Sequence, residues 1–548
     1  MASTGTIDTV SSGGSGASAS AGSGSAAASG VGFGGTGAAS GDSADAGDAG
    51  ESAQDGAADG GGPQRQLKVP FDWVGILGTG QSLAVGGGPA INMSTTQPFK
   101  NIKLADNGAD PKYPIDNTGS PQWAVVPLVE PIRPRGPGSG PGYSDGQYPN
   151  NIEAESPHSG MANTLSTLWA ARGLGDYVTA HAEFGWSGHC LADLNKQGGK
   201  RAYPASLHEA GVWKMLAAKA NKSFGYAAII LTHGECDGGN PGYEAGIYQL
   251  WQDYNTDLKA ITGQPQDIPM LVSQQSTVNT GATGSGVAVW LAGIAHPGQI
   301  LCTGPKYQYQ YLRDNLHLPA PGYERLGQKY AEVFDLVINQ KVAWKPLQPN
   351  KIARSGATIT VGFDVPTPPL VWDAHVSLPH QQVNTEWAAG KGFEVTSGQG
   401  AKLGIASTAI QGTNVIITLA ADPGTDKITV AYALTQDGGG AQGGTNQGMR
   451  GLLRDSDEFI GYDAETLDTQ VTQGSALVTA SSAGGFIHRS GWDIVTGTDV
   501  PADTIVRTQD SNDQLTLSVQ WAKTSGRVKL SYRHDERNFC VHFSMKEP

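Results

Sequence analysis

The sequence predicts an α/β domain with a mainly parallel sheet, followed by one or more β-sandwich domains. Between about residues 67 and 344, short apolar runs alternate with stretches of helical spacing, a pattern typical of parallel strands covered by helices on both faces. Beyond Pro346 the apolar period changes to two residues, as in antiparallel strands with one buried face. A Gly-rich, acidic composition sets a third segment apart at the start of the chain.

This first segment has the composition of a disordered tether. Residues 1–62 hold 18 of the 77 glycines and seven acidic residues, and the first basic residue is Arg65. The segment therefore carries −7 of the formal net charge of −14, and the rest of the chain carries the other −7. Gly, Ser, Ala and acidic residues bury too little apolar surface to offset their chain entropy. We expect a disordered tether over residues 1–65.

The strands and helices of the α/β domain can be placed in order from apolar spacing and turn residues. We expect strand 71–77, helix 160–173, strand 177–180, helix 205–221, strand 225–231, strand 268–272 and helix 323–338. The last helix follows Pro319 and Pro321, residues that favour a helix start. In the β-rich half we expect strands 359–365, 415–419 and 428–432, and a further β-patterned segment at 467–531 behind the Gly-rich stretch 438–448.

Composition and charge exclude several classes of protein. A moderate negative charge is unlike that of nucleic-acid-binding proteins, which cluster Lys and Arg. No run reaches the 18 apolar residues of a membrane-spanning helix, and residues 1–4 show neither the charged nor the apolar region of a signal peptide. The four cysteines are too few for a disulfide scaffold. We expect no nucleic-acid partner and no transmembrane span, and the oligomeric state stays open.

A serine stands at the carboxyl end of the first predicted strand. Residues 78–82 read Gly-Thr-Gly-Gln-Ser, and open α/β sheets place their sites at this edge. A dinucleotide fingerprint is disfavoured because Leu83 replaces its third glycine, and an α/β-hydrolase elbow because Ala84 replaces its second. Taken alone, Ser82 could also be a turn serine bonded to its own backbone.

A candidate base lies just before the last predicted helix, where residues 314–317 read Asp-Asn-Leu-His. At this spacing the Asp314 carboxylate can reach one imidazole nitrogen of His317 and leave the other free to take a proton. An isolated pair of this kind is also common on surfaces and in cores, so the motif alone does not decide.

Two further polar loops follow predicted strands. Residues 232–237 read Thr-His-Gly-Glu-Cys-Asp, and residues 184–189 read Phe-Gly-Trp-Ser-Gly-His. A glycine such as Gly188 can offer its N–H group to an oxyanion because no side chain blocks the approach. The potential ligands of the first loop are nearly consecutive, and no second His/Cys pair stands at zinc spacing. We therefore expect no metal.

In this order the four motifs resemble the SGNH (GDSL-like) hydrolase superfamily. The Gly-Gln-Ser motif resembles its branch of sialate O-acetylesterase-like and acetylxylan-esterase-like carbohydrate esterases in particular. The resemblance covers about residues 70–343 and implies a three-layer α/β/α parallel-sheet hydrolase domain. It implies that Ser82 is the nucleophile, His317 the general base and acid, and Asp314 its orienting partner, with the N–H groups of Ser82 and Gly188 in the oxyanion hole.

The third motif departs from the superfamily pattern, because His233 stands where this branch more often has Gln. We assign its imidazole the hydrogen bond to the oxyanion that the amide would donate. The site-lining and bracing residues are expected to be Gln81, Glu235 and Asp237. If the loops of Cys190 and Cys236 meet over the site, a disulfide can form, and two buried free thiols are the alternative. Residues 155–163 also resemble a family segment that lines the site, or they begin a helix capped by Ser156 or Ser159.

The β-rich half carries a second resemblance. Residues 450–457 and 538–543 resemble adjacent pieces of the β-domain that follows some Gly-Gln-Ser esterases, which implies that the final strand returns to the sandwich. The predicted domains are thus the tether at 1–65, an SGNH-like esterase domain at 66–345, a β-sandwich at 346–461 plus 536–548, and an inserted β-module at 462–535. Residues 491–518 resemble a small β-motif of secreted and phage-tail proteins, to which we attach no chemistry.

The sequence thus predicts a cofactor-free serine carboxylesterase that removes O-acetyl groups from a polysaccharide or glycan through an acyl-enzyme. We expect it to be secreted or tethered to a cell surface, although this chain shows no export signal, and a phage virion is the alternative location. The rival hypothesis is a carbohydrate-binding or adhesive surface protein, or a phage-tail protein, with a relic or accessory esterase domain. The esterase hypothesis and its rival differ in whether Ser82 is activated as a nucleophile.

Overall fold

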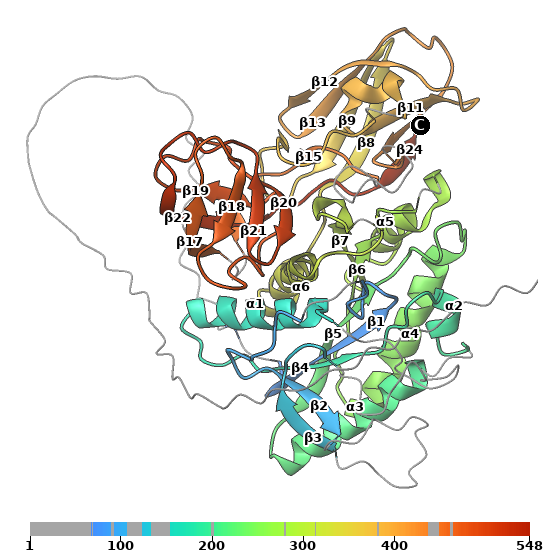
Figure 1. Ribbon diagram of the computed structural model, residues 1–548. Helices are drawn as coiled ribbons and strands as arrows, with labels where there is room; N and C mark the ends of the chain where they lie inside the picture. The colour runs from blue at the N-terminus through green and yellow to red at the C-terminus, as the bar shows by residue number, and fades with distance from the viewer. Residues whose placement is uncertain are drawn as a thin grey trace, which may run out of the picture. The chain divides into compact units, whose positions relative to one another are not determined.

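The computed structural model describes residues 67, 70–88, 92–106, 123–132, 154–198, 202–278, 281–312, 314–380, 383–436, 449–460 and 464–548. The predicted tether and the Gly-rich stretch 438–448 lie outside the described residues. Residues 66–548 form one unit, and Figure 1 shows its helices and strands.

A seven-stranded sheet with the order β3-β2-β4-β1-β5-β6-β7 forms the first part of this unit. Its strands are β1 (Trp73–Gly80), β2 (Ile102–Asp106), β3 (Trp123–Pro127), β4 (Thr179–Glu183), β5 (Phe224–Thr232), β6 (Met270–Gln274) and β7 (Ile300–Pro305). The edge strand β3 is antiparallel to β2, and the other neighbours are parallel. The predicted fold class, an α/β domain followed by β-rich parts, is confirmed at this level, and the assignment to the SGNH type stays a prediction.

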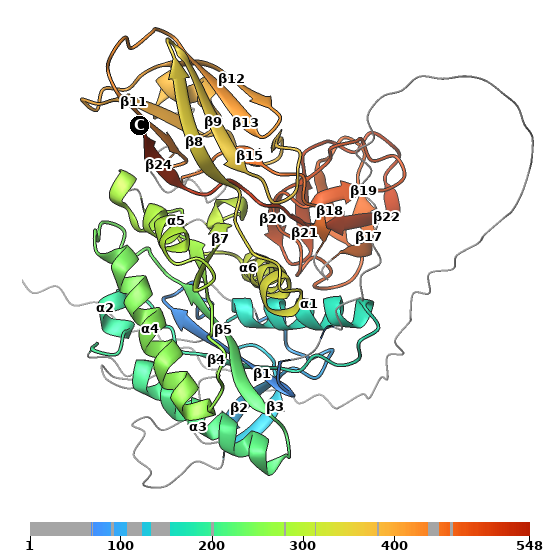
Figure 2. The same cartoon turned by 180° about the vertical axis from the view of Figure 1, so that it is seen from behind.

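Helices cover both faces of the sheet (Figures 1 and 2). On one face lie α1 (Pro157–Ala171) and α6 (Ala320–Phe334), which share a buried apolar cluster with Val74, Ile76 and Ile230. On the other lie α3 (Ala202–Lys219), α4 (Tyr243–Thr262) and α5 (Ser285–Ala295), packed against Leu77 and Ile229. Because neighbouring residues of a strand point to opposite faces, the wholly buried β5 serves both clusters. The short helix α2 (Leu191–Leu194) follows β4.

The next part of the chain packs two antiparallel sheets into a sandwich. One sheet has the order β12-β13-β9-β8 and the other β11-β14-β24. Their bounds are β8 (Gln348–Ser355), β9 (Thr358–Asp364), β11 (Phe393–Ser397), β12 (Ile405–Gln411), β13 (Asn414–Leu419), β14 (Ile428–Tyr432) and β24 (Phe543–Lys546). The alternation of buried Val415, Ile417 and Leu419 in β13 turns one face to this core. β24, near the end of the chain, pairs antiparallel with β14.

A separate six-stranded sheet, β19-β22-β17-β18-β21-β20, lies between β14 and β24 in the sequence. Its strands are β17 (Glu465–Val471), β18 (Leu477–Ala480), β19 (Ile494–Thr496), β20 (Val506–Ser511), β21 (Gln514–Leu517) and β22 (Gly526–Arg533). We call residues 465–533 the inserted sheet. It has its own apolar core, which includes Phe486, Leu515 and Tyr532. Two further pairs of strands are present. β10 (Val371–Trp372) pairs with β15 (Leu453–Arg454), and β16 (Phe459–Ile460) pairs with β23 (Asp535–Glu536). In the sequence, β16 precedes the inserted sheet and β23 follows it.

Buried ion pairs attach the inserted sheet to α6. Arg325 Nη2 lies 2.7 Å from Asp493 Oδ1, and the side chains are 2% and 0% exposed. His488 Nδ1 lies 3.3 Å from Glu324 Oε2 on the same helix. A buried charge whose partner is removed costs several kcal/mol, roughly 3–5. The contacts explain why α6 carries buried charged residues on a face that does not meet the sheet.

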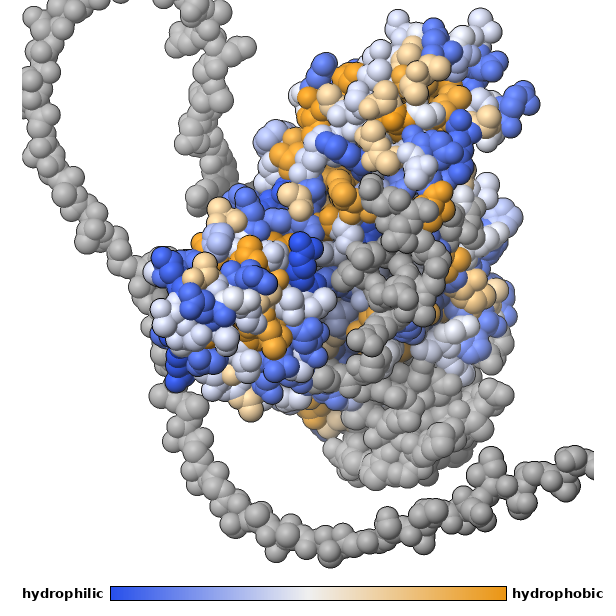
Figure 3. Space-filling model, turned by 45° about the horizontal axis from the view of Figure 1, so that its top comes forward, coloured by the Kyte–Doolittle hydropathy of each residue, from blue (hydrophilic) through white to orange (hydrophobic). Residues whose placement is uncertain are grey.

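The described part of the surface is mixed in character. No helix among the described residues is long and apolar enough to cross a membrane. Figure 3 shows apolar residues in small groups among hydrophilic ones, and the exposed apolar side chains include Leu378 and Val383 of the sandwich. Scattered exposed residues of this kind are normal on protein surfaces.

Helices α1 and α6 approach each other closely because glycines face backbone at their crossing. A Cβ on Gly160 of α1 would lie 2.2 Å from the Glu324 carbonyl oxygen, and one on Gly327 of α6 would lie 2.1 Å from that of Pro157. The approach fixes the position of α6 relative to the sheet, and α6 begins directly after the loop that carries His317.

We expect Gly160→Ala to destabilise the protein by about 1–3 kcal/mol, because the added methyl group meets immobile backbone. Gly211→Ala is the matched control, since Gly211 lies inside α3 and nothing stands within 4 Å of its Cβ position. There the same substitution should stabilise by about 0.5–1 kcal/mol. Thermal unfolding of the two variants measures both effects, and equal shifts in Tm would contradict the packing described here.

Candidate active site

The serine turn begins where β1 ends. Gly80 has a φ of +146°, and a Cβ there would lie 2.1 Å from the Thr232 carbonyl oxygen, so only glycine fits beside β5. The turn that follows is closed by the Ala84 N–H, which donates to Gln81 O at 2.8 Å. Ser82 lies on this turn with 6% of its surface exposed. The strand and turn thus present Ser82 at the carboxyl edge of the sheet.

Asp314 and His317 form a hydrogen-bonded pair in the loop before α6. The Asp314 Oδ2 to His317 Nδ1 distance is 2.6 Å, and Asp314 Oδ1 accepts from the Leu316 and His317 N–H groups, each at 3.0 Å. Partial burial opposes ionisation, but these hydrogen bonds prevail and lower the pKa of Asp314. A carboxylate can only accept, so the proton of the ring lies on Nδ1 and Nε2 is left as the acceptor.

The serine turn and the His317 loop meet at two consecutive glycines. A Cβ on Gly87 would lie 2.7 Å from Ser82 Cβ, and one on Gly88 would lie 3.2 Å from His317 Cβ. The Gly87 N–H donates to Ser82 O at 2.6 Å, and the Tyr323 hydroxyl of α6 donates to Gly87 O. The structure therefore brings Ser82, His317 and Asp314 to one region of the sheet edge, and their catalytic roles stay predictions. Gly87 and Gly88 were not among the predicted site residues.

The loop after β4 packs against the serine turn at Gly185, and Gly188 follows three residues later in the same loop. A Cβ on Gly185 would lie 3.1 Å from the Gly80 carbonyl carbon, and the Trp186 N–H donates to Gly80 O at 2.8 Å. Gly188, by contrast, is exposed, has a φ of +76°, and has nothing within 4 Å of its Cβ position. Among the described residues, neither the Ser82 nor the Gly188 N–H donates to a protein acceptor.

His233 takes a different place from the one predicted. Its ring is fully buried, with Nδ1 2.9 Å from the Tyr243 hydroxyl and Nε2 3.0 Å from the carbonyl oxygen of His189. Because a carbonyl only accepts, the single proton of the neutral ring lies on Nε2 and is already donated. The imidazole is therefore not placed to donate to an oxyanion. It holds His189, the neighbour of Gly188.

A disulfide and three side chains connect the loops at this edge. Cys190 and Cys236 form a disulfide, with a Cα–Cα distance of 5.0 Å, which settles the pairing that the sequence left open. Gln81 Oε1 accepts from the Cys236 N–H at 3.1 Å, and Asp237 Oδ2 accepts from the Leu191 N–H at 2.7 Å. Glu235 forms a buried ion pair with Lys306 at 2.6 Å. Gln81, Glu235 and Asp237 thus join loops. The bracing roles of Glu235 and Asp237 and the site-lining role of Gln81 stay predictions.

A buried polar network behind β1 joins His158, which belongs to the segment 155–163 noted in the sequence, to His181 and Glu183, which the sequence analysis did not single out. His158 Nε2 lies 2.9 Å from Glu183 Oε2, His158 Nδ1 lies 2.7 Å from His181 Nδ1, and Glu183 Oε1 accepts from the Gly185 N–H. The absence of a side chain at Gly78 leaves room for this network of polar side chains, because a Cβ there would lie 2.1 Å from Glu183 Oε2. Ser156 caps α1, as the alternative interpretation of residues 155–163 states.

The buried Glu155 next to this cap binds another loop. Its carboxyl group accepts hydrogen bonds from the N–H groups of Met93 and Ser94 at 2.8 and 2.9 Å. Burial, together with the charge of Glu130, raises the pKa of Glu155 to about 8. This arrangement braces the loop and does not place the Glu155 side chain at the predicted site.

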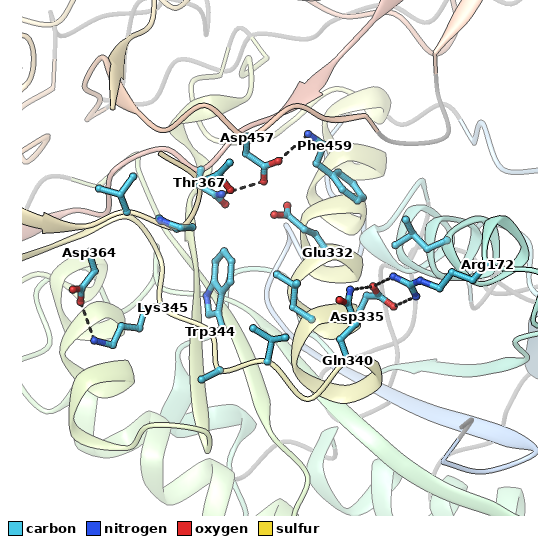
Figure 4. Close-up of a pocket in the computed structure, with 17 residues that line it drawn as sticks. Arg172, Glu332, Asp335, Gln340, Trp344, Lys345, Asp364, Thr367, Asp457 and Phe459 are labelled. Atoms are coloured by element: carbon cyan, nitrogen blue, oxygen red, sulfur yellow. Dashed lines mark hydrogen bonds and ion pairs between the residues drawn. The ribbon is translucent and has the colours of Figure 1, made fainter. Parts of the chain in front are cut away.

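The described residues also enclose a cavity of about 650 Å³ that none of the predicted site residues lines. It lies beside the last turns of α6, with Glu332, Trp344 and Asp457 among the side chains drawn around it in Figure 4. At 1.5 Å per residue, the length of α6 separates this cavity from the His317 loop by roughly 20 Å. No group of His, Cys, Asp or Glu among the described residues has the arrangement of a metal site.

Comparisons with known proteins give matches of low identity and low TM-score. No protein-family model and no curated protein matches the sequence. Among solved structures, a carbohydrate acetylesterase from Xanthomonas citri is 12% identical with a TM-score of 0.39, covering 69% of this chain and 77% of its own. A protein from Arabidopsis thaliana is 14% identical with a TM-score of 0.34, covering 48% and 98%. NanS is 9% identical with a TM-score of 0.30, covering 49% and 98%.

The environment of His233 predicts a pH dependence of stability. Burial lowers the pKa of His233 below its ordinary value of 6.5, so the unfolded chain takes up a proton there that the folded chain does not. Stability from this group is present above pH 6.5 and is lost as the pH falls below it. Each proton that only the unfolded chain binds lowers the free energy of unfolding by about 1.4 kcal/mol for every unit that the pH falls. We expect His233→Gln to flatten the fall in unfolding free energy below pH 6.5.

Denaturant unfolding at a series of pH values measures this slope. His208→Gln, at a half-buried position of α3, is the control and should leave the slope as in the parent. An unchanged slope in His233→Gln would contradict a buried, neutral ring.

Proposed function

We propose that the protein is a serine carboxylesterase that removes O-acetyl groups from a glycan. The observation that carries the proposal is the hydrogen bond between Asp314 and His317, in a loop that meets the serine turn across Gly87 and Gly88. An oriented imidazole next to a serine at the carboxyl edge of a parallel sheet is the arrangement that activates a hydroxyl. The choice of an acetylated polysaccharide or glycan as substrate follows the resemblance of the Gly80-Gln81-Ser82 motif.

In the proposed reaction, Ser82 Oγ attacks the ester carbonyl and His317 Nε2 takes the hydroxyl proton. The tetrahedral intermediate collapses, and His317 gives that proton to the departing sugar oxygen, which leaves an acetyl group on Ser82. Water then attacks this ester with His317 as base. The bond from the acyl carbon to Ser82 Oγ breaks, His317 returns the proton to Ser82 Oγ, and acetate leaves. Asp314 keeps the proton of the neutral ring on Nδ1 and stabilises the imidazolium that forms in each half of the reaction.

The oxyanion is assigned to backbone donors. We place it between the Ser82 N–H and the N–H of Gly188, whose side-chain-free surface gives a substrate close access. His233 is proposed as a positioning residue, because its Nε2 proton holds the His189 carbonyl. The disulfide fixes the same loop at Cys190, the residue after His189, and a disulfide suits the oxidising conditions of a secreted or surface protein.

The first test replaces Ser82 with Ala. We expect acetate release from 4-nitrophenyl acetate and from acetylated polysaccharides to fall by at least about 10³-fold, because the nucleophile is lost. Ser187→Ala removes a hydroxyl from the neighbouring loop of the same edge and should retain activity. A fluorophosphonate should label the parent at Ser82. Unchanged hydrolysis by Ser82→Ala would refute the assignment, and an unlabelled, inactive parent would favour the relic interpretation.

The second test removes the disulfide by the double change Cys190→Ser and Cys236→Ser. Loosening the loop that carries Gly188 should lower kcat by roughly 10–100-fold, since a displaced oxyanion donor acts mainly in the transition state. Cys302→Ala, which removes a buried free thiol from β7, controls for the loss of a thiol. Steady-state kinetics below the Tm of each variant give the result. An unchanged kcat in the double variant would separate the disulfide from catalysis.

A further inference from the structure

A cleft of about 510 Å³ lies between the sandwich and the inserted sheet, away from the proposed catalytic residues. On the side of the sandwich, the cleft is lined by Trp372 of β10, by His375 and by Arg454 of β15. Its other side is formed by residues 494–497 and 500–503 together with Arg533 and Arg537. A smaller cavity that shares His375, Ile494 and Arg537 with it contains Asp373 and Asp535. Most of one wall thus comes from the 491–518 motif, to which the sequence analysis attached no chemistry.

Three arginines of this cleft share two buried carboxylates. Arg454 Nε lies 2.7 Å from Asp373 Oδ2, while Arg533 Nε and Arg537 Nη2 lie 3.0 and 2.5 Å from the carboxylate of Asp535. Asp373 and Asp535 are 6% and 8% exposed. They hold the guanidinium groups in place, and the exposed Glu458 is a third carboxylate whose charge acts on Arg537.

Further charges sit at the margins of the cleft. Lys391 Nζ lies 4.5 Å from the centroid of the Trp372 ring and brings a fourth cation, and Asp503 is an exposed carboxylate of the opposite wall. Burial is the main cause that lowers the pKa of Arg537, and the nearby charge of Arg454 lowers it further, while the carboxylates of Asp535, Asp373 and Glu458 act in the opposite direction.

The arginines have more N–H donors than the carboxylates of Asp373 and Asp535 use. A guanidinium group has five N–H donors in a planar fork. Arg454 uses Nε for Asp373 and Nη1 for the Asp455 carbonyl, and Arg533 turns Nε and Nη2 to Asp535. The Arg533 side chain is 42% exposed. Such a fork matches a carboxylate in two parallel hydrogen bonds.

We propose that this cleft binds a sugar unit that carries a carboxylate, as part of a glycan. The arginines bind the carboxylate, and the half-buried Trp372 offers an aromatic surface to the sugar ring. A glycan with isolated carboxylates is favoured over a dense polyanion such as nucleic acid, because the chain after residue 62 still carries a formal net charge of −7. The inserted sheet thereby becomes half of a binding site, whether or not the α/β domain is an esterase.

Direct binding to the full chain tests this proposal. The probe is a hyaluronan tetrasaccharide, with one carboxylate for every two sugar rings, measured by calorimetry at low salt. The same tetrasaccharide with its carboxylates converted to amides is the neutral comparison. Neither probe carries an ester, so the result does not depend on the proposed hydrolysis. We expect the amide form to bind at least about tenfold more weakly, the loss of one charge-assisted contact.

Matched variants locate the site. Arg533→Ala should weaken binding about tenfold, whereas Arg527→Ala, on the same strand with a 61% exposed side chain, should not. Ala502→Trp should fill the cleft from an exposed position of its wall and abolish binding, whereas Ala522→Trp, at an exposed position outside the cleft lining, should not.

Five outcomes would overturn the proposal. The first four are no binding at millimolar concentration, equal binding of the amide form, equal effects of Arg527→Ala and Arg533→Ala, and tighter binding of a DNA oligonucleotide. The fifth is full displacement of the tetrasaccharide by an equal concentration of inorganic phosphate, since the cleft would then hold a simple anion.

Discussion

The parallel pairing of β1 with β4 and β5 is the constraint on which the proposed site depends. Gly78 pairs with Glu183, and Gly80 pairs with Thr232, so the three strands end side by side. Each continues into one of the polar loops, and all three loops leave the same edge of the sheet. Gly80 makes this possible because its missing side chain lets the serine turn pass against the Thr232 carbonyl. A slip in this register would separate Ser82 from the loops that support it.

The polar groups around this edge divide into those available for chemistry and those that hold loops. Asp314 and His317 are partly exposed, with side chains 43% and 18% accessible. His233, Glu235 and Lys306 are buried, and each has a protein partner within about 3 Å. Buried polar groups must be satisfied within the protein, and these groups use their hydrogen bonds on backbone and side chains of neighbouring loops. These groups support the proposed site, in which Asp314 and His317 are partly exposed and Ser82 is buried.

The sequence predicts local and periodic features of this structure well. The strand that ends at Gly80, the strongly apolar β5 and the Asp314–His317 pair each lie within a few residues of the prediction, because neighbours in the chain determine them. The short strands β2 and β3 were not predicted, since their few residues give little periodic signal. The role of His233 depends on Tyr243 and His189, ten and 44 residues away. Spacing could not distinguish a donor to substrate from a donor to the His189 carbonyl, nor decide whether Cys190 and Cys236 pair.

Mass spectrometry of the enzyme quenched with acid during turnover of 4-nitrophenyl acetate tests the central claim most directly, because it detects the proposed intermediate itself. The account predicts one acetyl group on the proteolytic peptide that contains Ser82, appearing within the first turnover and disappearing when substrate is exhausted. Acetate release with no acetylated peptide, or with the acetyl group on another residue, would contradict it.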